Sequence, residues 1–112
     1  MNTECIFCKI IHNLVSSTII DQTDELIVIK DIAPQAPIHY LIIPKKHCKD
    51  LKDVVDSDQQ MLGSLLLMAK KLSKKLSGNQ EFKIVINNGS SVGQSVFHLH
   101  VHFLAGNAQR HL

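Results

Sequence analysis

Three histidines alternate with apolar residues near the C-terminus, in the run of residues 98–102 that reads His-Leu-His-Val-His. Successive side chains of a β-strand point to opposite faces, so this spacing predicts three imidazoles on one face and the apolar residues on the other. A helix would rotate each residue by about 100° and scatter the rings around its axis. Three convergent imidazoles can bind a metal ion, act as a nucleophile or transfer protons. The alternative is a polar strand face without a chemical role, which this strict alternation disfavours.

A second group of candidate ligands is the pair Cys5 and Cys8, three positions apart. Two thiolates at this spacing can bind one zinc ion, which then needs two further ligands to complete its tetrahedron. His47 and His98 are the candidate histidine ligands. A redox-active pair is disfavoured because no long helix follows, and two ordinary buried thiols are the other alternative. We expect Cys48, next to His47, to be simply buried.

The loop of residues 87–95, which reads NNGSSVGQS, directly precedes the histidines. Glycine lets backbone amides approach an anion closely, and successive amides can form an anion-binding concavity. No lysine follows the glycines and the next element is a strand, so this is not a Walker loop. Such a loop is often only a turn, but its position beside three histidines predicts a phosphate site.

The elements that must position these groups are strands for the most part. Apolar and β-branched residues predict strands at 18–20, 26–29, 39–43, 82–86 and 96–104. Apolar residues at helical spacing from 62 to 76 predict one amphipathic helix, started by a capping box of Ser57 and Gln60 and ended by Gly78. Residues 5–12 predict one or two helical turns. We therefore expect an α+β fold, a five-stranded antiparallel sheet with one long helix and a short N-terminal helix.

Length and composition limit the possible classes of protein. The chain has 112 residues, which fits a single domain spanning residues 1–112. A formal net charge of +2 does not indicate nucleic-acid or membrane-surface binding. The first residues lack the features of a signal peptide, no run of about eighteen apolar residues occurs, and three cysteines do not make a disulfide scaffold. We expect a cytoplasmic protein that binds neither nucleic acid nor a membrane.

Together these motifs resemble those of the histidine-triad (HIT) superfamily, and in particular its Hint branch of nucleotide-binding proteins. Five blocks carry the resemblance in the family's order and cover residues 5 to about 104: Cys5–Ile10, Asp31–Pro37, Ile43–His47, Gly93–Val96 and His98–Leu104. The resemblance implies the same five-stranded antiparallel fold, a homodimer, and hydrolysis of the P–N bond of purine nucleoside 5′-phosphoramidates such as those of AMP or GMP.

The resemblance also implies a role for each matching residue. His100 would be the nucleophile that attacks the α-phosphorus and becomes transiently nucleotidylated. His102 and Ser95 would contact the phosphate and the leaving group, and His39 would support the triad unless it is only a hydrogen-bonded core histidine. The further substrate contacts would be Asp31 with the ribose, Ile32 with the base, and Asn87, Gly93 and Gln94 with the phosphate.

Similar proteins with a Cys-x-x-Cys start imply a structural zinc ion bound by Cys5, Cys8, His47 and His98. His98 is therefore assigned to the metal, and catalysis is left to His100 and His102. A zinc ion with four protein ligands has no open position, which disfavours a zinc-dependent hydrolysis.

Two other functions stay open at this stage. One is hydrolysis of dinucleoside polyphosphates, as in the Fhit-like branch, although the Gln94-Ser95-Val96 run and the Cys-x-x-Cys start favour Hint. The other is a nucleotide-binding adaptor without turnover. After the triad many Hint members continue Leu-Gly-Gly-Arg and a tail with tryptophan and prolines, whereas residues 104–112 here read LAGNAQRHL. This difference leaves the preferred leaving group open.

Overall fold

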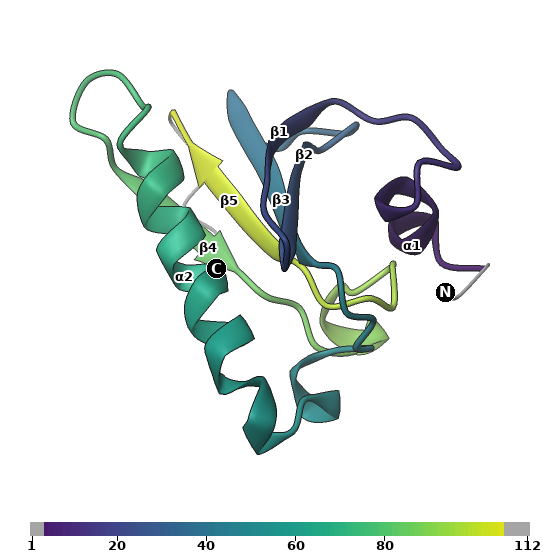
Figure 1. The fold of residues 1–112 in the computed structure, drawn as a ribbon. Coiled ribbons are helices and arrows are strands. Elements are labelled where there is room, and N and C mark those ends of the chain that lie inside the picture. The colour runs from purple at the N-terminus through teal and green to yellow at the C-terminus, as the bar shows by residue number, and fades with distance from the viewer. Residues whose placement is uncertain (1–3, 107–112) are drawn as a thin grey trace.

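The computed structural model describes residues 4–106, which form a five-stranded antiparallel sheet with helices on both faces (Figure 1). The strands are β1 (Ile19–Gln22), β2 (Leu26–Lys30), β3 (Ile38–Pro44), β4 (Phe82–Val85) and β5 (Val101–Ala105). The helices are α1 (Ile6–Ile11) and α2 (Gln59–Ser73), with 3-10 turns η1 (Leu51–Asp53), η2 (Asp56–Asp58) and η3 (Ser90–Val92). The predicted α+β fold is confirmed.

The strand that carries the last of the three histidines lies inside the sheet. The strand order is β1-β2-β3-β5-β4, so β5 is paired on both sides. On one side His102 lies opposite Leu41 of β3, and on the other it lies opposite Val85 of β4. Two neighbouring strands therefore fix the backbone on which His102 is mounted.

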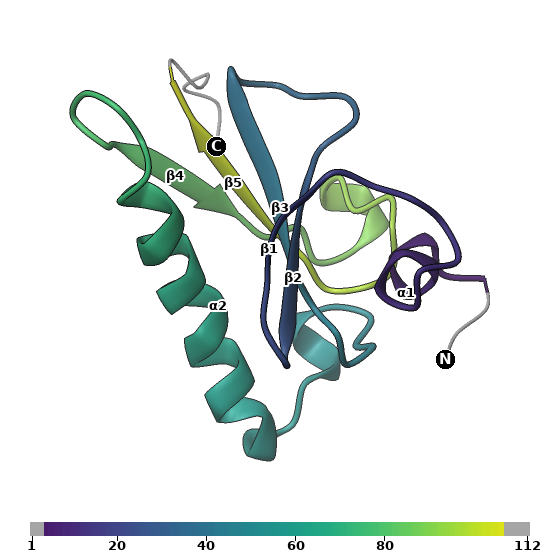
Figure 2. The ribbon, with the colours of Figure 1, turned by 45° about the horizontal axis from the view of Figure 1, so that its top comes forward.

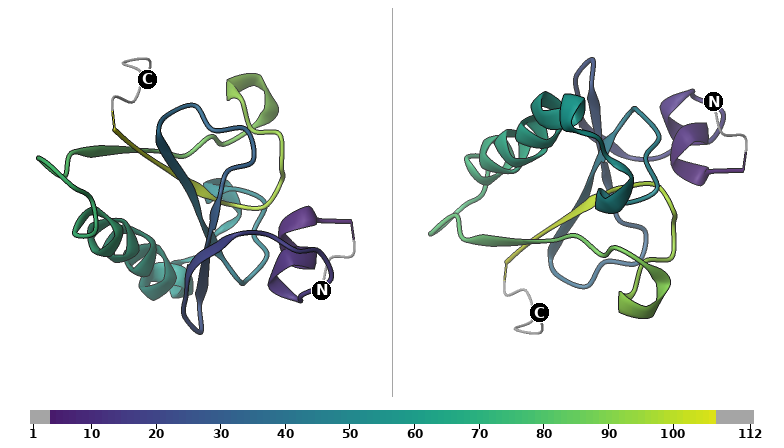
Figure 3. Two further views of the ribbon diagram at one scale, coloured as in Figure 1. Left: turned by 90° about the horizontal axis from the view of Figure 1, so that it is seen from above. Right: turned by 90° about the horizontal axis from the view of Figure 1, so that it is seen from below.

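The two faces of the sheet bury different sets of residues. Side chains of β2, β3 and β5 that point to one face pack against α2, and they include Leu26, Val28, Ile42, Val101 and Phe103. The alternate residues of β2 and β3 pack against α1 on the other face: Ile27, Ile29, Leu41 and Ile43. Figures 2 and 3 show α2 and α1 on opposite sides of these strands. Because both faces are covered, every residue of β2 except Lys30 is buried.

The long helix forms as predicted, but both of its ends differ from the prediction. Neither Ser57 nor Gln60 makes a capping box, because the turn η2 precedes the helix and Asp58 lies at its start. The carboxylate of Asp58 accepts the backbone N–H of Val55 at 3.0 Å and pairs with Lys46 at 2.6 Å. The helix ends at Ser73, five residues before Gly78, whose φ of +72° serves the following turn instead.

The histidine strand is shorter than the sequence predicts. Strand pairing in β5 begins at Val101, so residues 96–100 lie outside the ladder. Two other interactions fix this segment: the Leu99 amide donates to the Cys48 carbonyl at 2.7 Å, and the His98 ring packs among cysteines. The predicted alternation nevertheless holds, since Leu99 joins the α2 core with Val101.

Some predictions concern residues that the structure does not describe. The N-terminal residues 1–3 and the C-terminal residues 107–112 lie outside the described range. The predicted effect of the C-terminal sequence on the leaving group therefore stays a prediction. Within residues 4–106, no helix is both long and apolar enough to cross a membrane.

Candidate functional site

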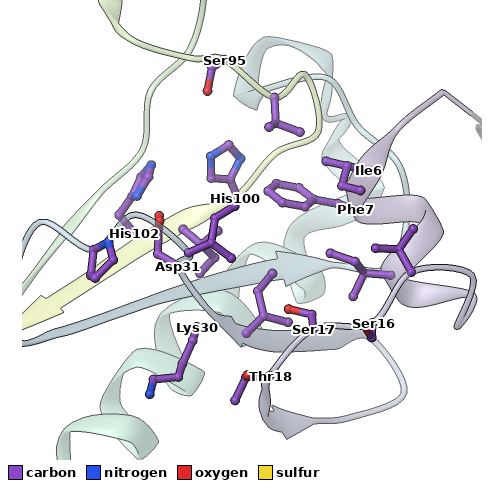
Figure 4. Close-up of a pocket in the computed structure, with 17 residues that line it drawn as sticks. Ile6, Phe7, Ser16, Ser17, Thr18, Lys30, Asp31, Ser95, His100 and His102 are labelled. Atoms are coloured by element: carbon purple, nitrogen blue, oxygen red, sulfur yellow. The ribbon is translucent and has the colours of Figure 1, made fainter.

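A cavity of about 860 Å³ opens between α1, β2 and two histidines of the triad, His100 and His102 (Figure 4). Figure 4 shows His100 close to Ser95 and Phe7 at one end, with His102 and Asp31 beside it, and the polar residues Ser16, Ser17, Thr18 and Lys30 on the opposite side. The other walls are largely apolar and include Ile6, Phe7, Ile10, Val15, Ile29, Leu41 and Val96. A cavity of this size, with apolar walls and a few convergent polar groups, suits a small organic ligand.

A backbone carbonyl determines which nitrogen of the His100 imidazole carries the proton. Its Nδ1 lies 2.7 Å from the carbonyl oxygen of His98. A carbonyl can only accept, so Nδ1 carries the proton and Nε2 keeps its lone pair. Burial lowers the pKa of His100, which favours this neutral form. The edge-on ring of Phe7, with centroids 5.1 Å apart, fixes the plane of the imidazole. The Nε2 atom of His100 therefore has the free lone pair that nucleophilic attack requires.

His102 shares a hydrogen-bonded cluster with His39 and Asp31. The Nδ1 atom of His102 lies 2.9 Å from Nε2 of His39, and that same Nε2 lies 3.3 Å from a carboxylate oxygen of Asp31. Burial, together with the nearby His100 and His39 rings, lowers the pKa of His102 to about 4. The cluster therefore presents His102 to the cavity as a neutral ring.

The predicted phosphate loop borders a second cavity of about 470 Å³, which also reaches His100 and His102. Asn87, Gly93 and Ser95 line it, and Ser95 also lines the larger cavity. Gly93 has a φ of +98°, and a Cβ there would lie 3.4 Å from the Asn87 amide nitrogen. The Asn87 amide in turn donates to the Val92 carbonyl at 2.8 Å. Glycine at this position lets the loop turn tightly beside the histidines.

Gln94 and Ile32 lie differently from the other predicted substrate contacts. Gln94 is buried and lines neither cavity. Its side-chain oxygen accepts the Gly89 amide at 2.8 Å, and its side-chain nitrogen donates to the carbonyls of Lys49 and Val96. The side chain thus braces the loop. Ile32 lies at the rim of the larger cavity with 99% of its side chain exposed. Their contacts with a substrate stay predictions.

The four predicted metal ligands, Cys5, Cys8, His47 and His98, come together beside the triad. His98 Nδ1 lies 3.3 Å from Cys5 Sγ, 3.7 Å from Cys8 Sγ and 3.1 Å from His47 Nδ1. The distance from Cys8 Sγ to His47 Nδ1 is 3.3 Å. Tetrahedral coordination with bonds of about 2.0–2.3 Å separates ligand atoms by roughly 3.3–3.8 Å. These residues lie close enough to hold a metal ion.

Hydrogen bonds with backbone atoms orient the ligand side chains of the same cluster. His98 donates its Nε2 proton to the Pro44 carbonyl at 2.7 Å, so its Nδ1 lone pair faces the sulfur atoms. Cys5 also caps α1, because its Sγ accepts the Cys8 amide at 3.4 Å. The ligand cluster thus joins the start of α1 to the histidine run. Cys48 is buried outside the cluster, as predicted.

The wall of the larger cavity that α1 supplies was not predicted from the sequence. Ile6 and Phe7 lie between the two cysteines, and Ile10 follows one turn later. The sequence signal that could have indicated this wall was the short helix predicted at residues 5–12. Two cysteines that bind one ion fix the helix orientation, and its apolar residues must then pack against the neighbouring histidines.

Comparisons with known proteins agree with this site. The family model described as scavenger mRNA decapping enzyme C-term binding matches residues 4–111. An uncharacterized HIT-like protein from Synechocystis is 44% identical over 106 residues, covering 95% of this chain and 93% of that protein. The structure of a HIT family hydrolase from Legionella pneumophila is 41% identical, covers 91% of this chain and 92% of its own, and has a TM-score of 0.86.

A histidine triad protein from Clostridium difficile is 34% identical, with 100% of this chain and 98% of that chain covered and a TM-score of 0.93. The chain therefore belongs to the HIT superfamily, within the family that the matching model describes. The superfamily predicted from the sequence is confirmed, and the Hint branch stays a prediction.

The lowered pKa of His102 predicts a specific pH dependence of stability. The unfolded chain takes up a proton on this histidine near pH 6.5, whereas the folded chain does so only near pH 4. The free energy of unfolding should therefore fall as the pH is lowered from about 6.5 to about 4. His102→Asn should remove part of this slope, equivalent to less than one proton because the ring is partly exposed.

Urea unfolding of the wild type and of His102→Asn at several pH values measures this slope. His12→Asn, at the exposed end of α1, is the matched control substitution. Equal slopes for the wild type and His102→Asn would contradict the assignment.

Proposed function

We propose that this protein hydrolyses purine nucleoside 5′-phosphoramidates through a nucleotidyl intermediate on His100. The observation that carries the proposal is the 2.7 Å bond from His100 Nδ1–H to the His98 carbonyl, which leaves Nε2 as a lone pair in a cavity. A neutral imidazole attacks phosphorus and is later displaced by water. The name of the Legionella relative, a HIT family hydrolase, supports hydrolysis as the class of reaction.

The larger cavity offers complementary contacts to a nucleoside. Apolar side chains of α1, β2 and β3 form a slot for the flat base, with Ile32 at its rim. Asp31 supplies acceptors for the ribose hydroxyls, and its carboxylate is partly exposed. Ser95, with the loop that holds Gly93 and Asn87, lies where the 5′-phosphate would approach His100. The base would then lie against the apolar wall, and the 5′-phosphate would lie beside His100 and Ser95.

In the first step Nε2 of His100 forms a bond to the phosphorus and the P–N bond breaks, while the departing amine takes up one proton from solvent water. The neutral His102 ring donates a hydrogen bond through Nε2–H and keeps its proton, because its loss would leave an imidazolate. The His100 ring, whose centroid lies 5.0 Å away, carries the positive charge of the nucleotidyl intermediate. A water molecule next attacks the phosphorus, gives up one proton to solvent and displaces His100, which releases the nucleoside monophosphate. Both histidines end in their starting forms.

The first experiment measures turnover of a fluorogenic adenosine 5′-phosphoramidate by the wild type, by His100→Ala and by His12→Ala as the control. We expect His100→Ala to lose at least about three orders of magnitude in kcat/KM. Rapid acid-free quenching and mass spectrometry should detect wild-type protein carrying one added AMP on His100.

Diadenosine tetraphosphate, measured in parallel, separates the alternatives. Cleavage of the dinucleotide alone would assign the protein to the dinucleoside polyphosphate hydrolases. AMP binding without turnover of either compound would favour a nucleotide-binding adaptor.

We also propose that the cluster of Cys5, Cys8, His47 and His98 holds a structural zinc ion. Two thiolates and two imidazoles are a donor set typical of zinc, and four protein ligands leave no position for substrate. The ion would supply no step of the reaction. It would hold α1, and therefore Phe7, against His98 and His100, whose rings lie 5.9 and 5.1 Å from the Phe7 ring.

Removal of the ion should lower stability before it affects chemistry. Purified protein should contain one zinc per chain by elemental analysis, and Cys5→Ser should lose it together with several degrees of melting temperature. Cys48→Ser is the matched control, because this buried cysteine lies outside the cluster. Equal zinc content in Cys5→Ser and Cys48→Ser would contradict the site.

We propose in addition that the protein is a homodimer in which β4 meets a second copy. Strand β4 is an outer strand of the described sheet, and unpaired strand edges readily pair with another chain. Large apolar side chains are exposed on the adjoining elements, Leu66 and Leu67 on α2 and Phe82 at the start of β4. Their exposure favours burial against a partner.

Light scattering of the eluting protein during size-exclusion chromatography tests the dimer. The wild type should have twice the mass of one chain, and Leu67→Glu should shift it towards the monomer because a buried charge opposes association. Leu14→Glu changes an equally exposed leucine after α1 and should leave the dimer intact. A monomeric wild type would exclude this arrangement.

A further inference from the structure

The imidazole of His39 has partners at both ring nitrogens, and one of these partners is a backbone amide. The ring is buried, and its Nδ1 lies 3.1 Å from the backbone nitrogen of Gln35. A backbone N–H can only donate, so Nδ1 of His39 must be an unprotonated acceptor. Burial also lowers the pKa of His39, which favours a neutral ring.

The proton of a neutral His39 must then be on Nε2, and this determines the state of the next ring. Nε2 lies 2.9 Å from Nδ1 of His102 and 3.3 Å from the Asp31 carboxylate, so its proton can point to either acceptor. Whichever acceptor it takes, an N–H on Nδ1 of His102 would face another N–H at 2.9 Å, so this Nδ1 is unprotonated and the proton of a neutral His102 is on Nε2. One backbone amide thus sets the protonated nitrogen of two histidines.

The conformation of the loop of residues 31–37 directs this amide towards His39. The Asp31 amide donates to the His39 carbonyl at 3.0 Å, and an Asp31 carboxylate oxygen accepts the Ala33 amide at 2.8 Å. Pro34 precedes Gln35 and has no N–H of its own. The loop therefore folds back over the His39 ring with the Gln35 amide directed at Nδ1, while the side chain of Gln35 is exposed.

The same amide determines which cluster can bind a metal ion. Ligand atoms of Asp31, His39 and His102 all lie within 4.8 Å of one another, close enough for a metal ion. His39 could bind a cation only through a lone pair on Nε2, which would move its proton to Nδ1. Two N–H groups would then face each other at 3.1 Å. In the cysteine cluster the backbone does the opposite, because the Pro44 carbonyl keeps the proton of His98 on Nε2.

We propose that the backbone N–H of Gln35 is a positioning group that fixes the tautomers of His39 and His102 and keeps the Asp31–His39–His102 cluster free of metal ions. Its effect on the reaction rests on the proposed hydrolysis. The tautomers and the exclusion of metal do not, since they are properties of the protein without substrate.

Long-range nitrogen–proton NMR spectra of the ¹⁵N-labelled wild type test the tautomers directly. His39 and His102 should show protonated Nε2 and unprotonated Nδ1, and His100 should show the reverse. A protonated Nδ1 on His39 would overturn the proposal. This measurement needs neither a variant nor a substrate, so it decides the assignment even if the variants below fold poorly or phosphoramidates are not hydrolysed.

Two substitutions separate the amide from the side chain of Gln35. Gln35→Pro removes the side chain and the N–H, whereas Gln35→Ala removes only the side chain. Relative to Gln35→Ala, we expect Gln35→Pro to lose the Nε2–H signature of His39 and roughly 10²-fold in kcat, at the lower end of what one preorganised hydrogen-bond donor contributes. Identical spectra and rates for the two variants would overturn the proposal.

A double-mutant cycle with His39→Gln distinguishes positioning from simple damage to the loop. Glutamine at position 39 carries its own N–H donor towards His102 and has no Nδ1 for the amide to contact. Gln35→Pro should therefore cost little in the His39→Gln background. An equal loss in both backgrounds would mean that the proline only disrupts the loop, which would overturn the proposal.

Zinc provides a readout independent of turnover. Titration of zinc into the wild type and Gln35→Ala should saturate at one ion per chain, whereas Gln35→Pro should take up a second ion that His102→Asn removes. A second strong site in the wild type, or none in Gln35→Pro with a protonated Nδ1 on His39, would contradict the exclusion of metal.

Discussion

The arrangement of the site depends on how the chain holds His98. Its ring is fully buried, its Nε2 proton is bound by the carbonyl of Pro44 at the end of β3, and its Nδ1 faces two cysteines and His47. Its own carbonyl accepts the Nδ1 proton of His100. A single residue therefore connects the cluster of Cys5, Cys8 and His47, an inner strand and His100. Displacement of His98 would disturb all three, because each contact fixes a different atom of the same residue.

One face of the sheet forms the apolar core, and the other face carries the candidate site. Its α2 face is a continuous apolar core, in which Phe103 stacks between Tyr40 and Phe82. Its α1 face carries the imidazoles and the cavity. Because alternate residues of one strand point to opposite faces, Phe103 anchors β5 while its neighbour His102 reaches the cavity. The core thus positions the reactive side chains without containing any of them.

The sequence predicts those features that depend on side-chain periodicity. Alternation identified the strands and the face of the triad, and the 3.6-residue period identified α2. Boundaries were less predictable because distant contacts set them. The contact of Leu99 with Cys48 ends strand pairing at Val101, and the pairing of Asp58 with Lys46 fixes the turn before α2.

The candidate metal ligands of the site could be predicted from the sequence, but the residues whose contacts hold the site in place could not. The residue types of Cys5 and His98 indicate metal binding, and the structure brings them together. The role of Phe7 was missed because it depends on where α1 packs. Gln94 was predicted as a phosphate contact, yet its amide is taken up by three backbone partners that no local pattern reveals. Contacts to backbone atoms carry no signature in the side-chain sequence.

The same limit explains why three identical side chains on one face can offer different nitrogen atoms to their surroundings. Alternation makes His98, His100 and His102 equivalent in position, but their free nitrogens differ. A carbonyl at Nε2 leaves the Nδ1 lone pair of His98 facing the cysteines, and a carbonyl at Nδ1 leaves the Nε2 lone pair of His100 free. The N–H of His39 at Nδ1 leaves His102 with a proton to donate. Since burial keeps all three rings neutral, each must hold its single proton on one nitrogen, and the partner at the other determines which. The chemistry of this site is therefore assigned by the hydrogen-bond partners of the rings, which depend on the fold.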